Sequence, residues 1–388
     1  MPLISIIIAV YNNEKYINNA INSVQNQDFE DYEIIIVDDG STDGTPKLVD
    51  DAANKDTRIH VVHQKNQWIY ASFNNGVKIA KGKYIYILNS DDILLPDSLN
   101  SISRLIDKYN HPDVVWTGIS DYYCDNELNI HNKVNVRDWI TSEAFYVINN
   151  NPEIIIKLYR NNYFRDQANV YKRDIMLKVP FRNDFYAADS YFNYEIACVI
   201  NTCVVQRQST YAHFRFDDKN KNVANKKYYG YEHYMYNELF LKAIEMLEAR
   251  NICTEENKKL FVSRRKGQIA SEIKMLLEDE SYKSVVERLD EVFMIPYDST
   301  MEECFGGLQG KEEFEARILS QLEKYLLEME IVSPEIENHF AYRLLNNLLR
   351  YEKTEEEYEV IKASIFQKKN PYHIGETFYN RLISHQNN

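Results

Sequence analysis

The feature that most constrains the fold is a series of short, continuous apolar runs in roughly the first 120 residues, of which "SIIIAV" and "EIIIVDD" are the clearest. Continuous runs of this kind are typical of strands buried on both faces of a sheet. Stretches with helical spacing lie between them, as in an α/β domain whose mainly parallel sheet is flanked by helices. The runs predict strands at residues 3–10, 33–37, 59–63, 84–88 and 113–117.

The pattern changes along the rest of the chain. A helix is expected at 187–200, followed by two strands in "CVVQRQ" and "TYAHFRF" and by a lysine-rich polar stretch at 217–227. Beyond about residue 231 helical periodicity dominates, for example in "NELFLKAIEMLEARN". We therefore predict an α/β catalytic domain at 1–225 and an all-helical region at 226–388, with a role in packing, oligomerisation or acceptor binding.

Composition excludes several classes of protein. The formal net charge of -14 argues against a nucleic-acid partner, which would need a basic face. The 5 cysteines are scattered without a CxxC pair, which indicates neither a disulfide framework nor a zinc site and fits a reducing cytoplasm. No stretch approaches the ~20 apolar residues of a membrane span. Peripheral association with the inner face of a membrane stays open.

Polar clusters follow three of the predicted strands: "AVYNN", "VDDGSTDGT" and "LNSDD". The carboxyl ends of parallel strands share one edge, where open α/β sheets bind their ligands. The sequence has neither the GxGxxG nor the GxxxxGK[ST] motif of nucleotide-phosphate loops. The adjacent carboxylates of Asp91 and Asp92 repel each other unless a cation offsets them, and Mg²⁺ and Mn²⁺ prefer such oxygen ligands. This edge is therefore a candidate divalent-metal site.

These stretches resemble the family 2 glycosyltransferases of GT-A fold, bacterial cell-surface polysaccharide or teichoic-acid type. The resemblance covers roughly residues 3–230 and rests on "PLISIIIAVYNNEKYINNAINSVQNQDFEDYEIIIVDDGSTDGT", "NNGVKIAKGKYIYILNSDDILLPDSL" and "AADSYF". It implies a GT-A Rossmann-like sheet and an inverting enzyme that moves a sugar from a UDP-sugar to a hydroxyl. The implied acceptor is a cell-surface glycan or wall polymer, and the implied cofactor is Mn²⁺ or Mg²⁺.

The same resemblance assigns roles to single residues. Asp91 is the implied metal ligand, with His213 as a second candidate. Asp189 is the implied general base, which takes the proton of the acceptor hydroxyl as the new bond forms. The implied nucleotide-binding residues are Ala9, Tyr11, Asp38, Asn89 and Ser90.

Two positions depart from the family pattern. Asn89 replaces a carboxylate, and Phe73 stands where an arginine often contacts the diphosphate. Lys65, Arg173 and His213 are the candidates for a replacement cation. These departures keep open a catalytically degenerate binding or scaffold subunit as the alternative. A nucleotidyltransferase is less favoured, because "AVYNNEKY" lacks a glycine-rich, basic phosphate loop.

Several of these residues also have purely structural interpretations. Asp38 is equally suited to capping the next helix, and Asp189 to starting one. Trp68 and Tyr70 fit either loop packing or stacking against a sugar ring. The sequence leaves these alternatives open.

Overall fold

The computed structural model describes residues 1–136, 142–165, 167–184, 186–217, 230–278, 284–307 and 310–328. The chain divides into two compact units. The first contains Met1–Lys221 and Lys242–Lys258, and the second contains Asn222–Leu241 and Lys259–Asn388. The boundary predicted at 225/226 lies outside the described residues.

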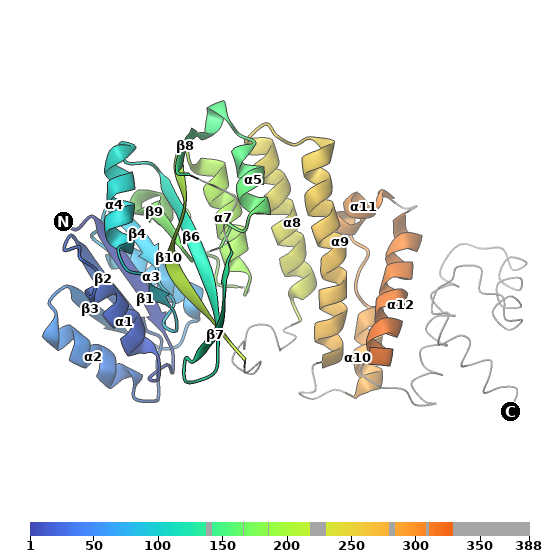
Figure 1. Ribbon diagram of the computed structural model, residues 1–388. Helices are drawn as coiled ribbons and strands as arrows, with labels where there is room; N and C mark the ends of the chain where they lie inside the picture. The colour runs from blue at the N-terminus through green and yellow to red at the C-terminus, as the bar shows by residue number, and fades with distance from the viewer. Residues whose placement is uncertain are drawn as a thin grey trace, which may run out of the picture. The chain divides into compact units, whose positions relative to one another are not determined.

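The first unit is built on a sheet in which ten strands fall within the described residues, in the order β3-β2-β1-β4-β9-β6-β10-β5 (Figure 1). Two further pairings attach β7 to β6 and β8 to β10. The strands are β1 (Ile4–Val10), β2 (Tyr32–Asp38), β3 (Ile59–His63), β4 (Tyr84–Ile87), β5 (Ile93–Leu94), β6 (Val114–Cys124), β7 (Ile130–Asn135), β8 (Ala144–Val147), β9 (Asn169–Lys172) and β10 (Thr202–Phe216).

The sheet is mixed but mainly parallel, as predicted. Strands β1, β2, β3 and β4 pair in parallel, and so do β6 and β10. Strand β9 lies antiparallel between β4 and β6, and β5, β7 and β8 are antiparallel additions. Residues of β1 and β2 are buried along their whole length, as continuous apolar runs require.

Helices cover both faces of this sheet. Helices α1 and α4 pack on one face, where their apolar stripes share a core with alternate residues of β1. Helix α3 packs on the other face, so close that a Cβ on Gly76 would lie 2.6 Å from the Ile7 side chain. The helices of this part are α1 (Ile17–Gln25), α2 (Thr45–Lys55), α3 (Ile69–Ile79), α4 (Ser98–Lys108), α5 (Ile154–Arg160), α6 (Arg173–Lys178) and α7 (Ala188–Val199).

The prediction of two strands in "CVVQRQ" and "TYAHFRF" is wrong, because these segments form the single strand β10. Register shifts against β6 occur between Val205 and Tyr211, so the chain bulges there without turning. Gly118 of β6 accommodates the bulge, since a Cβ at that position would lie 2.3 Å from the Arg207 carbonyl oxygen. The unbroken strand carries residues 211–214 to the end of β4.

The helical prediction for the C-terminal region is confirmed within the described residues. The helices are α8 (Glu232–Ala249), α9 (Glu255–Glu278), α10 (Val285–Phe293), α11 (Ser299–Phe305) and α12 (Gly310–Glu328). In the second unit, the buried Arg265 guanidinium pairs with Glu272 at 2.7 Å and donates to the Asn237 carbonyl oxygen at 2.8 Å. Every charge in this buried group therefore has a partner.

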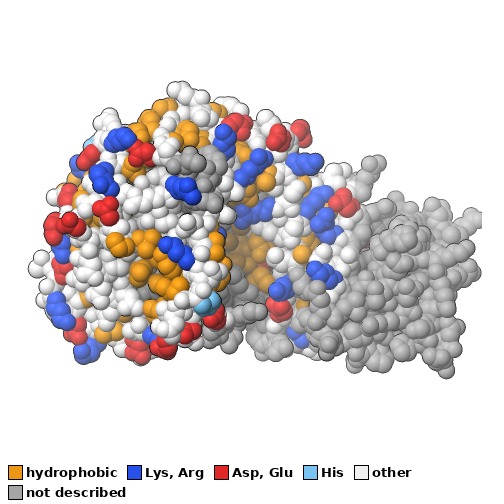
Figure 2. All heavy atoms as spheres, in the orientation of Figure 1, with side chains coloured by type: hydrophobic (Ala, Val, Ile, Leu, Met, Phe, Trp, Pro, Cys, Tyr) orange, Lys and Arg blue, Asp and Glu red, His pale blue; other side chains and the backbone are white. Residues whose placement is uncertain are grey.

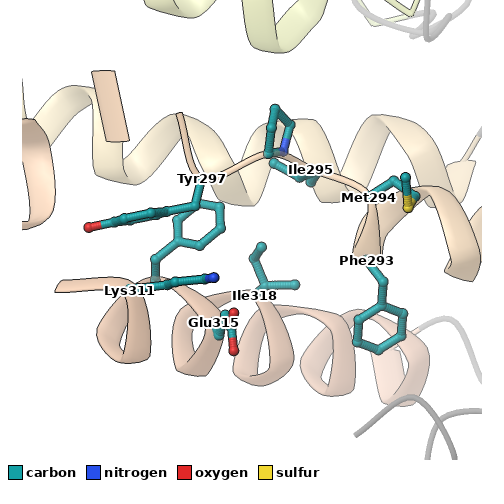
Figure 3. Close-up of a pocket in the computed structure, with 9 residues that line it drawn as sticks. Phe293, Met294, Ile295, Tyr297, Lys311, Glu315 and Ile318 are labelled. Atoms are coloured by element: carbon teal, nitrogen blue, oxygen red, sulfur yellow. The ribbon is translucent and has the colours of Figure 1, made fainter. Parts of the chain in front are cut away.

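The second unit also has a small cavity of about 220 Å³. Its walls are the turn that follows α10, which carries Ile295 and Tyr297, and one side of α12, which carries Ile318 (Figure 3). None of the helices in the described parts of the chain combines the length and the apolar character needed to cross a membrane. On the visible face of the first unit, acidic and basic side chains are interspersed (Figure 2).

Candidate functional site

The carboxyl ends of β1, β2 and β4 lie side by side, because β1 pairs in parallel with both of the other strands. Asp38 is the last residue of β2, lies opposite Val10 of β1 and is only 2% exposed. Its Oδ1 accepts a hydrogen bond from the Ser41 backbone N–H at 3.1 Å. Its Oδ2 lies 2.8 Å from Nδ1 of His63. A buried carboxylate thus stands at the sheet edge with two fixed partners.

Asp39, the next residue, bonds to the loop that follows β3. Its Oδ1 accepts from Nε2 of Gln64 at 2.7 Å and from the backbone N–H of Gln67 at 2.8 Å. The Gly40 backbone also approaches this loop, since a Cβ there would meet the Asn66 nitrogen at 3.0 Å. Asp39 therefore anchors the loop that connects β3 to α3.

That loop ends in an unusual residue. Trp68 has a positive φ of 77°, a conformation that is rare and strained for a bulky side chain. Its carbonyl oxygen accepts from the Ser72 backbone N–H at 3.1 Å and from the Ser72 hydroxyl at 3.1 Å, and its ring is 44% exposed. Tyr70, by contrast, is buried and stacks on Phe181, so loop packing is its role.

The loop after β1 connects the ends of β2 and β4. The Asn12 backbone N–H donates to the Ser41 hydroxyl at 2.9 Å. The Asn13 side chain donates to the Ser90 hydroxyl at 2.8 Å. Next to this loop Ala9 is buried and Tyr11 is 51% exposed. The ends of three neighbouring strands thus carry all five residues expected to bind the nucleotide: Ala9, Tyr11, Asp38, Asn89 and Ser90.

Asp92 is held by β10. It is 1% exposed, and its Oδ1 accepts from the Phe214 backbone N–H at 2.9 Å. Its Oδ2 accepts from the Tyr211 hydroxyl at 2.7 Å and from the Asn89 amide at 3.3 Å. Burial, and then the neighbouring charge of Asp91, raise the pKa of Asp92. The Asp92 carboxylate is thus satisfied by a backbone N–H and a phenol of β10.

His213 is held by Asp121 through one of its two ring nitrogens. Its Nδ1 lies 2.9 Å from Asp121 Oδ1, and Arg215 donates to the other oxygen of Asp121 at 3.1 Å. Burial lowers the pKa of His213, but the hydrogen bond to Asp121 and the charge of Asp92 outweigh it, and the net pKa is raised. A carboxylate that holds one ring nitrogen in this way is the usual support of a metal-ligating imidazole, so His213 stays a candidate ligand through Nε2.

Among the described residues, no three His, Cys, Asp or Glu side chains are grouped as a metal site. The oxygen donors are the half-buried Asp91 carboxylate and, beside it, Asn89, whose Oδ1 is buried without a hydrogen-bond partner. Magnesium-type ions often take only one or two carboxylates and complete their shell with substrate phosphates and water. This donor set fits such an ion only together with a bound phosphate group.

The structure separates the three candidates for a replacement cation. Arg173 is not at the site, because its guanidinium donates to the Ala80 carbonyl at 2.7 Å and its backbone to Lys83, just before β4 begins. That is the amino edge of the sheet. Lys65 lies in the loop after β3 and is exposed, and His213 lies next to the end of β4. Phe73 is fully buried among aromatic rings.

Asp189 lies in the first turn of α7 and is half-buried. The segment before α7 is tied to the start of α3, because the Tyr70 hydroxyl donates to the Tyr186 carbonyl at 2.7 Å. Phe192 of α7 stacks on Phe181 with ring centroids 4.0 Å apart. Helix α7 therefore has a rigid anchor.

Three residues with defined contacts at this site were not predicted from the sequence: His63, Tyr211 and Asp121. Each acts through a partner on another strand, so no local spacing signals it. The one available signal concerned His63: it ends the predicted strand at 59–63, and the end of that strand was expected to lie beside the end of the strand that carries "VDD".

Comparisons with known proteins agree with this geometry. Residues 5–180 match the family model described as Glycosyl transferase family 2. EpsH of Bacillus subtilis (strain 168) is 41% identical over 103 residues, which are 26% of this chain and 30% of EpsH. Glycosyltransferase GlyG of Streptococcus pneumoniae serotype 4 is 31% identical over 185 residues, 47% of this chain and 60% of GlyG. The chain thus spans less than two thirds of either relative.

The solved structure of S. aureus TarS 1-349 matches with a TM-score of 0.56 at 18% identity, over 84% of this chain and 92% of that chain. TarS 1-349 in complex with UDP-GlcNAc matches with a TM-score of 0.53 at 18% identity, over 96% and 93%. These matches show a common fold, a GT-A type sheet followed by helices. The family model alone identifies residues 5–180 as a glycosyl transferase family 2 domain.

Proposed function

We propose that this protein is an inverting, metal-dependent glycosyltransferase (EC 2.4) that moves a sugar from a UDP-sugar to a hydroxyl of a cell-surface glycan or wall polymer. The observation that carries the proposal is the buried Asp38 at the end of β2, between the strand ends that bear Tyr11 and His63. The family of residues 5–180 supports it. UDP-GlcNAc, bound in the TarS structure, is the first donor to test.

Asp38 would recognise the base. An ionised carboxylate accepts a hydrogen bond from the uracil N–H, and a base without that donor would leave a buried acceptor unpaired. Tyr11 supplies an exposed ring next to it. Asn89 and Ser90 would contact the ribose or the diphosphate from the β4 side.

Asp91 and the diphosphate oxygens would hold Mg²⁺ or Mn²⁺. When bound, the ion neutralises the negative charge that develops on the departing UDP. Asp189, on α7, would accept the proton of the acceptor hydroxyl while its oxygen attacks the sugar carbon from the face opposite the diphosphate. The bond to the diphosphate breaks as the new bond forms, which inverts the configuration.

Two further assignments complete the proposal. The helical region predicted at 226–388 serves packing, self-association or acceptor binding. The reaction is cytoplasmic, with peripheral association at the inner membrane face as an option, because 5 scattered cysteines without a CxxC pair suit a reducing compartment.

One experiment tests the function. Binding of UDP, UDP-GlcNAc, GDP and CMP is measured by calorimetry with and without Mn²⁺, and UDP release is then followed with wall-polymer and glycan acceptors. We expect uridine nucleotides to bind most tightly, Mn²⁺ to strengthen them, and one acceptor class to stimulate UDP release. Absence of nucleotide binding would refute the proposal.

The amide of Asn89, in place of a carboxylate, favours a second candidate: a subunit that binds a UDP-sugar without transferring it. That candidate predicts uridine nucleotide binding with no UDP release, whatever the acceptor. The same measurements therefore separate the two.

A further inference from the structure

His63, the last residue of β3, lies between two carboxylates from different elements. Its Nδ1 is 2.8 Å from Oδ2 of Asp38 on β2, and its Nε2 is 3.0 Å from Oδ1 of Asp50 on α2. Asp38 is almost wholly buried, whereas Asp50 and His63 are partly exposed. These contacts connect the candidate base-binding carboxylate to the solvent through one imidazole ring.

The protonation of the ring follows from its contacts. A neutral imidazole has one N–H and can donate to only one carboxylate, so its other nitrogen would turn a lone pair towards a carboxylate oxygen. The imidazolium donates to both. The hydrogen bonds to Asp38 and Asp50 raise the pKa of His63, and burial opposes this only in part. The ring is therefore a cation over a wider pH range than an ordinary histidine.

Two elements that pack against β3 bring charged groups to the His63 ring. Strand β2 and helix α2 pack against β3 and present Asp38 and Asp50 to the ring. Asp39, which follows β2, points its Oδ1 to Gln64 and Gln67, and Asp51 of α2 pairs with Lys47 at 2.7 Å.

We propose that His63 is a positioning residue that orients the Asp38 carboxylate for the uracil N–H and offsets its charge, and that Asp50 holds the ring in place and charged. This inference rests on the proposed function. Each carboxylate oxygen has two acceptor positions, so Asp38 retains capacity for a base while Ser41 and His63 donate to it. An ionised acceptor selects uracil, which carries an N–H donor at that position, over cytosine, which carries an acceptor.

The pH dependence has a definite sign. Below the raised pKa of His63 the ring is a cation, which offsets the charge of the Asp38 carboxylate and holds it by a hydrogen bond. As pH rises through that pKa the cation is lost, the anionic nucleotide meets one more uncompensated negative charge, and affinity falls. Asp50→Asn removes one of the two hydrogen bonds that raise the pKa, so the fall should move to lower pH.

The experiment measures the dissociation constants of UDP-GlcNAc and of CDP on the full chain. The pH range runs from the acid side of neutrality to just below the pKa of the uracil N–H. UDP-GlcNAc is the better probe because its diphosphate does not titrate in this range. The variants are His63→Gln and Asp50→Asn. Asp51→Asn is the matched control, since it makes the same charge change on the same helix at a residue that pairs with Lys47.

We expect parent affinity for UDP-GlcNAc to fall about two- to tenfold across the pKa of His63, the effect of losing one hydrogen bond of ordinary strength. Asp50→Asn should show the same fall at lower pH, and Asp51→Asn should follow the parent. His63→Gln should bind weakly at every pH and discriminate less between UDP-GlcNAc and CDP. Histidine ring resonances in NMR should report the lowered pKa of His63 in Asp50→Asn without any nucleotide.

The outcomes distinguish failure of the proposed function from failure of the role proposed for His63. If the parent binds no uridine nucleotide, the proposed function fails. If it binds UDP-GlcNAc but the profile of Asp50→Asn coincides with that of Asp51→Asn, or His63→Gln keeps parent affinity and selectivity, the inference on His63 alone is wrong. His213 also has a raised pKa, but it does not contact Asp50, so only the shift in Asp50→Asn is diagnostic.

Discussion

Tyr211→Phe tests how strongly β10 holds the end of β4. The Tyr211 hydroxyl donates to Asp92 at 2.7 Å and accepts from the Asn89 backbone N–H at 3.1 Å. Its removal takes away a hydrogen bond to a carboxylate and one to a backbone donor, which together cost about 2–4 kcal/mol of unfolding free energy. At about 2–4 °C per kcal/mol for a domain of this size, the melting temperature should fall by roughly 5–15 °C.

The matched control is Tyr84→Phe. Tyr84 is equally buried, and its hydroxyl donates a single neutral hydrogen bond to the Pro112 carbonyl, at the opposite end of β4. That variant should lose only about 1 kcal/mol. Urea unfolding measures both losses, and UDP titration with and without Mn²⁺ should show a reduced metal effect in Tyr211→Phe alone. Equal losses of stability in the two variants would refute the reasoning.

Three further predictions concern the same edge of the sheet. Asp189→Asn should lower UDP release in the presence of acceptor by about 10²–10⁴ while calorimetry shows unchanged UDP binding, and near-normal turnover would assign the base elsewhere. Asp91→Asn should abolish the effect of Mn²⁺ on UDP affinity, and a Mn²⁺ titration that matches the parent would remove Asp91 as a ligand. Trp68→Gly should be more stable to urea than Trp68→Ala by about 1 kcal/mol, the reverse of the usual order, because only glycine adopts the positive φ without strain; the usual order would show that no strain is present.

The sequence predicted those parts of the fold that depend on local pattern. Strand β3 has the predicted bounds, β1 and β4 differ from theirs by one residue at one end, and β2 is longer by one residue at each end. Each of these runs is buried along its length or ends in polar residues, and both properties are visible in a short window of sequence. Strands β5, β7, β8 and β9 were not predicted, because their pairing partners lie far away in the chain and their own patterns are short or mixed.

The site shows the same division. The positions of Asp38 and Asp91 at strand ends could be predicted, since the end of a parallel strand is set by its own sequence. The partners of Asp38 and Asp92 could not, because His63 and Tyr211 reach them from other strands. Arg173 illustrates the converse error: the side chain has suitable chemistry, yet its place at the amino edge of β4 removes it from the site.

The long strand β10 has a consequence for how the protein is made. Asp92 accepts hydrogen bonds from Tyr211 and Phe214, which lie 119 and 122 positions further along the chain. During synthesis, β1 to β4 leave the ribosome well before β10 exists, so the end of β4 stays hydrated until residue 216 has emerged. Such distant pairing is slow to form. A nascent chain stalled before Thr202 should therefore be able to pair its first four strands while the β4 side of the nucleotide site is still unformed.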